Sequence, residues 1–169
     1  MKGLVEFVEM LSPEMISGWL IVIMGQGPLK NEIIAKAAER GVGENVKIFD
    51  YVPYAEMPKF YAAADLFLLP SRHDPNPLSV VEALHSGLPI ALSDRAGNVE
   101  EAVTENRNGW RLPVLCADSY KAVLKSVFET SAETLRDMGR CSKQENAVFW
   151  DTEKSVANFL EEMMGYIGA

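Results

Sequence analysis

The stretch that decides the fold class is Leu66-Phe67-Leu68-Leu69-Pro70-Ser71. Its four apolar residues follow one another without alternation and Pro70 ends the run, which is typical of a short buried strand of a parallel sheet. Further short runs that predict strands lie on either side of it, at residues 19–24, 46–49, 89–92 and 109–112. The run at 19–24 shows no alternation either, so we expect both of its faces to be covered.

Helical patterns separate these strands. They cover residues 3–16, 29–40, 56–64, 77–86, 99–103, 119–128, 134–138 and 152–166. Gly41 follows the second of them as a C-cap. Strands that alternate with helices form βαβ units, so we predict an α/β fold: a doubly wound, Rossmann-like parallel sheet of about five strands, with helices on both faces and further helices at the C-terminal end. Such sheets bind ligands beyond the carboxyl ends of their strands.

The composition indicates one ordered domain. The chain has 169 residues, of which 48% are hydrophobic and 24% charged, as in ordinary globular domains. A net charge of −8 argues against nucleic-acid binding, although it leaves room for a local basic pocket for one small anion. No apolar run reaches the ~18–20 residues of a membrane span, and the first residues lack a signal-peptide core. Cys116 and Cys141 have no metal-type spacing, so we expect unpaired thiols and a cytoplasmic protein.

A glycine-rich turn, Gly25-Gln26-Gly27-Pro28, follows the first strand. Glycines there let a backbone approach a ligand, and the helix after them offers free N–H groups. A dinucleotide-binding fingerprint needs a further glycine at position 30, which is Lys30, and an acid after the second strand, where Asp50 is the only candidate. The turn therefore argues against a dinucleotide-dependent oxidoreductase, and a plain strand-to-helix turn is the alternative interpretation.

The densest polar cluster of the sequence follows the third strand, from Ser71 to Ser79. Asn76 followed by Pro77 predicts the N-cap and the first residue of a helix. The amides of Leu78 and Ser79 would then point out of the helix start, where a phosphate can bind. No group of metal-ligating residues accompanies them, so we expect no metal site.

Two carboxylates belong to the same region, Asp74 in the loop and Glu82 on the helix. Helical side chains lean toward the N-terminus of their helix, so we expect both to line one pocket. Asp74 would accept hydrogen bonds from sugar hydroxyls and Glu82 from ribose hydroxyls, since an acid beside a phosphate repels it. The alternative is a turn-forming Asp74 and a surface Glu82. Gly97 indicates a further close backbone approach, with a solvated, capped loop as the alternative there.

Together these motifs resemble the signature region of retaining nucleotide-sugar glycosyltransferases of the GT-B fold, of the family-four type. The resemblance rests on their order and spacing and extends over about residues 2–165. The matching motifs are Pro70-Ser71, Asp74-x7-Glu82, Gly87-Leu88-Pro89, Ala96-Gly97-Asn98-Val99-Glu100 and Asn108-Gly109, with Gly25-Gln26-Gly27-Pro28-Leu29 upstream.

The resemblance implies roles for the matching residues. Glu82 corresponds to a glutamate that binds the ribose of the donor, Asp74 to an acid near the transferred sugar, and Lys2 to a phosphate-binding lysine; these three are the candidate catalytic residues. The remaining positions implied to contact the nucleotide are Gly25, Gly27, Tyr51 and Val52 beside the nucleoside, Leu78 and Ser79 at the diphosphate, and Gly97. The family needs no bound metal, and no cofactor is implied besides the donor substrate, a nucleotide diphosphate-sugar.

The sequence departs from the family pattern at several points. Asp74 stands in place of a glutamate, Pro77 in place of a glycine, and Ala96 in place of the first glycine of a Gly-Gly loop. In the family, a strand with an arginine precedes the step that is Lys2-Gly3 here, and a whole acceptor-binding domain precedes that strand.

From the resemblance we expect residues 1–169 to be a single donor-binding domain, the C-terminal half of a hexosyltransferase of glycan biosynthesis. We expect it to be inactive without the acceptor domain, and the full-length enzyme to be cytoplasmic or at the membrane surface. The alternative is a non-catalytic doubly wound module that binds a nucleotide or a partner protein. The predicted helix at residues 152–166 crosses to the other domain in the family, and in this chain alone its apolar side would offer a homodimer surface.

Overall fold

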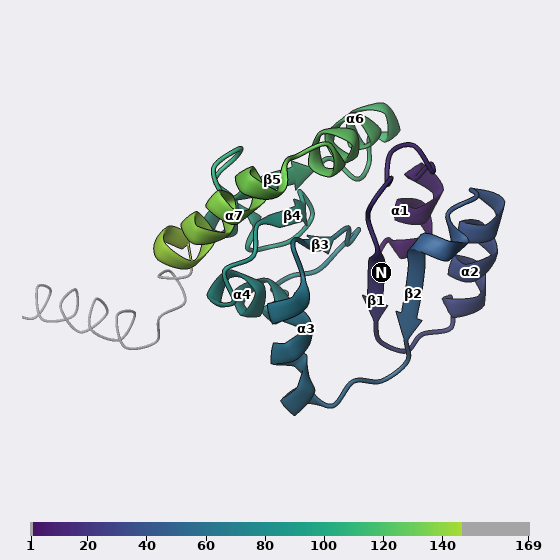
Figure 1. Cartoon of the computed structure of the whole chain (residues 1–169), viewed down its shortest axis with the longest axis horizontal. Helices are drawn as coiled ribbons and strands as arrows, with labels where there is room; N and C mark the ends of the chain where they lie inside the picture. Colours follow the sequence, from purple (N-terminus) through teal and green to yellow (C-terminus); the bar gives the residue numbers. More distant parts are fainter. Residues whose placement is uncertain (1, 147–169) are drawn as a thin grey trace, which may run out of the picture.

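The computed structural model describes residues 2–146 (Figure 1). The helix predicted at residues 152–166, with its homodimer surface, lies outside the described residues.

Five strands are present in residues 2–146, and every pair that they form is parallel. The strands are β1 (Ile21–Met24), β2 (Val46–Phe49), β3 (Phe67–Leu69), β4 (Ile90–Ser93) and β5 (Gly109–Leu112). β1 pairs with β2, and β3, β4 and β5 pair in that order. The α/β class and the parallel strands are confirmed. In the described part of the chain, however, no ladder joins β1 to β3, so the sheet consists of two separate ladders.

Seven α-helices occur in residues 2–146, close to the predicted ones. They are α1 (Leu4–Met10), α2 (Lys30–Glu39), α3 (Met57–Ala63), α4 (Leu78–His85), α5 (Val99–Ala102), α6 (Ala117–Phe128) and α7 (Ala132–Cys141). Short helical turns add Gly43–Asn45, Tyr54–Glu56 and Ser142–Asn146. The first prediction was wrong beyond Met10: Leu11 is already extended, and Pro13 cannot donate a helical hydrogen bond. Gly41 takes the left-handed conformation expected of a C-cap, with φ of 70°.

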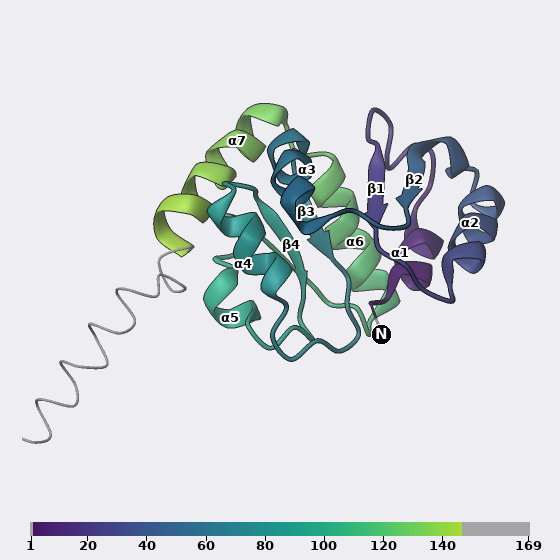
Figure 2. The same cartoon turned by 90° about the horizontal axis from the view of Figure 1, so that it is seen from below.

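Helices cover both faces of the β3–β4–β5 ladder (Figures 1 and 2). Ile90 and Leu92 of β4 pack into a cluster with residues of α3, α4 and α5. Ala91, between them, points the other way into a cluster that also contains residues of α1, α2, α6 and α7. The alternation along β4 therefore separates two apolar layers, as a doubly wound sheet requires.

Only one face of the β1–β2 ladder is covered in the same way. Ile23 is buried in the cluster that contains α1 and α2, whereas its neighbour Val22 is 41% exposed and Leu20 is exposed as well. The prediction that both faces of residues 19–24 are covered was wrong, because α1 and α2 pack together on the same side of this ladder (Figure 1).

Candidate functional site

The N-terminal residues of the described chain lie against the loop that follows β3. Gly3 has φ of 66°, and a Cβ at this position would collide with the carbonyl oxygen of Pro70. Lys2 Nζ forms an ion pair of 2.5 Å with Oδ2 of Asp74, whose side chain is only 14% exposed. Lys2 and Asp74, two of the three candidate catalytic residues and 72 positions apart in sequence, are therefore brought together.

Two further cations near this edge are also paired with acids. Arg72 Nη1 lies 2.9 Å from Oε1 of Glu6 on α1, and Lys30 Nζ lies 2.5 Å from Oδ1 of Asp50. A backbone hydrogen bond, followed by the hydrogen bond from Arg72, lowers the pKa of Glu6. The positive charges of Lys2, Lys30 and Arg72 are thus held by nearby carboxylates, and the exposed pairs of Lys30 and Arg72 are weak enough to exchange partners.

The loop after β4 is bonded to the loop after β3. The Gly97 amide donates to the Asp74 carbonyl at 2.9 Å, and the Asp74 amide donates to the Arg95 carbonyl at 3.4 Å, so that Asp74 and Ala96 form a parallel bridge. A Cβ on Gly97 would collide with the carbonyl oxygen of Pro75. Gly97 is therefore a site of close backbone approach to the neighbouring loop at Pro75.

Helix α4 begins one residue later than predicted. Pro77 is the N-cap, with extended φ and ψ of −71° and 105°, and Leu78 is the first helical residue. Asn76 does not cap the helix: its Oδ1 accepts a hydrogen bond from Nδ2 of Asn98 at 3.4 Å. Because no side chain caps α4, the amides of Leu78 and Ser79 at its start remain available to an anion.

Glu82 faces a different partner from Asp74. The hydroxyl of Tyr61, on α3, donates a hydrogen bond of 2.7 Å to Oε2 of Glu82. Burial first, and then the hydrogen bond to Glu82, raise the pKa of the Tyr61 hydroxyl, so the phenol remains a donor at neutral pH. Each of the two predicted carboxylates therefore has its own partner, Lys2 for Asp74 and Tyr61 for Glu82.

The loops after β1 and β2 carry the other predicted contacts. Gly25 has φ of 131° and its amide donates to the Phe49 carbonyl at 2.9 Å, which ties the two loops together at their start. Gly27 has open space around it. Tyr51 is exposed and Val52 is half-buried.

Sequence reasoning missed Tyr61 and Asn98. Tyr61 lies in an apolar helix pattern, and its contact with Glu82 depends on how α3 packs against α4. Asn98 was noted only as part of a motif, yet it is buried, it bonds across to Asn76, and its Oδ1 has no hydrogen-bond partner in the described structure. Ser71 Oγ is likewise buried without a partner there.

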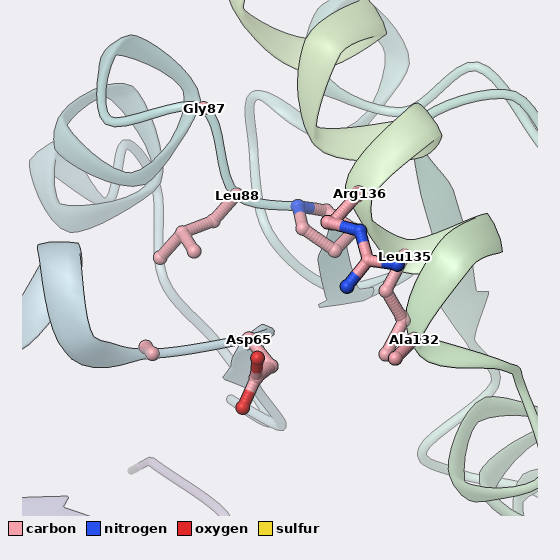
Figure 3. Close-up of a pocket in the computed structure, with 8 residues that line it drawn as sticks. Asp65, Gly87, Leu88, Ala132, Leu135 and Arg136 are labelled. Carbon is pink, nitrogen blue, oxygen red and sulfur yellow. The ribbon is translucent and has the colours of Figure 1, made fainter.

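A small cavity of about 90 Å³ lies at the opposite edge, where β3 and β4 begin (Figure 3). Leu88, Asp65 and Arg136 are among its lining residues, and none of the predicted site residues is. Within residues 2–146, no group of three or more His, Cys, Asp or Glu side chains could hold a metal ion. A search of the same residues finds no helix with the length and apolar character of a membrane span.

Comparison with known proteins matches the family model described as "Glycosyl transferases group 1" to residues 1–145. The amylovoran biosynthesis glycosyltransferase AmsK of Erwinia amylovora is 28% identical over 119 residues, which cover 67% of this chain and 29% of that protein. A D-inositol 3-phosphate glycosyltransferase of Segniliparus rotundus is 31% identical over 116 residues, which cover 69% of this chain and 25% of that protein. The chain thus spans less than a third of the length of these relatives.

Solved structures share the fold. The sucrose-phosphate synthase of Thermosynechococcus elongatus superposes with a TM-score of 0.76 at 18% identity, over 98% of this chain and 42% of that one. The C-terminal domain of a glycosyl transferase group 1 family protein (LpcC) of Francisella tularensis superposes with a TM-score of 0.73 at 18% identity, over 89% of this chain and 79% of that one.

Proposed function

The chain belongs to the glycosyl transferases group 1 family and has the fold of a C-terminal GT-B domain, and from this premise we propose that it binds the sugar donor of a retaining hexosyltransferase. The donor would be a nucleotide diphosphate-sugar, and the full enzyme would transfer its sugar to an acceptor hydroxyl. The observation that carries this proposal is the ion pair between Lys2, at the N-terminus, and Asp74, in the loop that leads from the end of β3 into the uncapped start of α4. A cation and free amides are suited to bind the diphosphate of such a donor, and a carboxylate is suited to accept hydrogen bonds from its sugar hydroxyls.

The Lys2–Asp74 ion pair would open when the donor binds. The Lys2 side chain is 58% exposed, so its ammonium group can exchange Asp74 for another anion, whereas the Asp74 side chain is only 14% exposed and needs a new hydrogen-bond partner when Lys2 leaves. A diphosphate would take over the ammonium group of Lys2, and the released Asp74 carboxylate would accept hydrogen bonds from hydroxyls of the transferred sugar. Donor binding would thereby hold the diphosphate and orient the reacting sugar at the same time.

The diphosphate is also the leaving group of the reaction, on which negative charge develops as the bond to the sugar breaks. Lys2 and the amides of Leu78 and Ser79 would stabilise that charge by fixed dipoles and a local cation. Glu82 would hold the ribose, and the backbone of the loop at Tyr51 and Val52 would contact the base.

Calorimetric titration of residues 1–169 with UDP, GDP and ADP tests the proposal. We expect saturable binding of at least one of them, weakened by Lys2→Met and unaffected by Lys47→Met. Lys47 is the matched control because it is an exposed lysine on β2 that forms no ion pair in the described structure. The proposal is wrong if none of the three nucleotides binds, or if the two lysine variants bind equally well.

We also expect residues 1–169 alone to transfer no sugar, because the relatives are three to four times longer than the part that they share with this chain. Incubation with UDP-glucose or GDP-mannose and simple sugar acceptors, followed by mass spectrometry, measures transfer. A glycosylated product formed by this chain alone would contradict the assignment as a donor-binding half.

A further inference from the structure

Tyr61 makes a specific contact with one of the predicted donor-binding residues. Its hydroxyl donates to Glu82 Oε2 at 2.7 Å, while the residue as a whole is only 7% exposed and its ring packs against Phe67 at a centroid distance of 6.2 Å. The ring is therefore fixed by the apolar cluster of α3, β3 and α4, and it holds the hydroxyl in one position. In the described structure no other hydrogen bond to the Glu82 carboxylate is found, which leaves Oε1 for a ligand.

The surroundings of this pair fit a nucleoside. Tyr61 lies on the helix that follows the loop predicted to contact the base, and Tyr54 in that segment is close enough to influence Tyr61 electrostatically. The hydrogen bond from Tyr61 links Glu82 to the helix that follows the loop of Tyr51 and Val52. In a nucleotide whose base contacts that loop, the ribose is the group next to the base, and Glu82 would be its hydrogen-bond acceptor.

We propose that Tyr61 is a positioning residue, whose hydroxyl fixes Glu82 Oε2 so that Oε1 is presented to a ribose hydroxyl. The inference rests on the proposed function, and it names a determinant of selectivity for ribonucleotides within that site. A free glutamate must give up rotamer freedom when it binds a hydroxyl. The hydrogen bond from Tyr61 removes part of that freedom before the ligand arrives, and the affinity for the ribose hydroxyl is higher as a result.

The test compares UDP, GDP or ADP, whichever binds the unmodified chain most tightly, with its 2′-deoxy and 3′-deoxy forms. Calorimetry gives the ratio of the affinities for the ribonucleotide and each deoxy form in four proteins: unmodified, Tyr61→Phe, Glu82→Ala and Tyr120→Phe. Tyr120→Phe is the matched control because it also removes one buried tyrosine hydroxyl, and that hydroxyl has no hydrogen-bond partner in the described structure.

We expect Glu82→Ala to abolish the preference for one ribose hydroxyl and Tyr61→Phe to reduce it by about threefold or more, a part of the roughly 10- to 100-fold effect of a hydrogen bond to a charged group. In Tyr61→Phe the affinity for the deoxy form should equal that of the unmodified chain. A merely structural loss would instead lower the affinities for the ribonucleotide and for its deoxy form together. Tyr120→Phe should leave the ratio unchanged.

Two failures can be told apart. If Glu82→Ala abolishes the preference and Tyr61→Phe, with a normal melting temperature, retains it, the role of Tyr61 is refuted while the proposed function stands. If Tyr61→Phe has a lower melting temperature than the unmodified chain, its affinity for the deoxy form distinguishes the two explanations. An equal fall in affinity for the ribonucleotide and for the deoxy form would show that Tyr61 is structural only. If no nucleotide binds, the proposed function fails, and the role of Tyr61 fails with it.

Discussion

The start of α4 offers a test in which a single backbone hydrogen-bond donor is removed. In Leu78→Pro the amide of the first helical residue disappears, and proline is well tolerated at this position because the N–H has no partner within the helix. Pro77 already has the extended conformation, with φ of −71° and ψ of 105°, that a residue before proline favours. Leu78 is 68% exposed, so the loss of its side chain costs little packing.

The size of the effect follows from the type of hydrogen bond. An amide that donates to a charged group contributes about 1.5–3 kcal/mol, so its loss should weaken diphosphate binding by roughly 10- to 100-fold. Leu78→Ala is the matched control, since it removes the same side chain and keeps the amide. Calorimetric titration of the unmodified chain and both variants with UDP and with uridine separates the diphosphate from the nucleoside.

We expect UDP to bind Leu78→Pro much more weakly than Leu78→Ala, and uridine to bind both equally. The reasoning is refuted if both variants bind UDP with the same affinity while circular dichroism shows an intact fold. A parallel loss of uridine binding would place the damage in the nucleoside site and would also count against a phosphate contact at this amide.

Two other predictions concern backbone packing and thiol chemistry. Gly97→Ala should lower the free energy of unfolding by about 1–3 kcal/mol in urea titrations, because the new Cβ would collide with the carbonyl oxygen of Pro75. Gly27→Ala is the control: its new Cβ lies in open space, so its free energy of unfolding should change by no more than about 0.5 kcal/mol. Equal stability of the two variants would contradict the packing argument. Cys116 should react with iodoacetamide at a lower pH than an ordinary cysteine, because hydrogen bonds with the Ser119 hydroxyl and amide lower the pKa of its thiol and favour the thiolate. Ser119→Ala removes the hydroxyl and should shift the pH dependence of the alkylation rate to higher pH. An unchanged profile would exclude that influence.

Much of the fold could be predicted because local signals agree with one another. The strands at residues 46–49 and 109–112 were predicted to the residue, and Gly41 ended its helix as expected. The errors arose where tertiary packing decides. A run such as residues 19–24 has the same pattern whether one face is covered or two, so the exposure of Val22 could not be read from it.

In the candidate site, too, single residues could be predicted from the sequence, whereas their tertiary contacts could not. The sequence pattern singled out Asp74 and Glu82 as candidate site residues, and the family resemblance added Lys2, but neither predicted the partners that the fold gives them. The Lys2–Asp74 pair spans 72 positions, and the contact from Tyr61 to Glu82 depends on the packing of two helices. Asn76 was assigned to the wrong role because Asn98, which reaches it from the next loop, competes for its side chain.

The division of the sheet into two ladders bears on how the molecule opens. With no backbone hydrogen bonds between β1 and β3, residues 2–49 and the β3–β5 part are joined by their common apolar cluster and by contacts such as the Lys2–Asp74 pair. Regions joined in this way tend to unfold as separate cooperative units, so amide protons of β1 and β2 should exchange with solvent sooner than those of β4. The candidate site residues follow strands of both ladders, and a nucleotide held by both would fasten one unit to the other and slow exchange in β1 and β2.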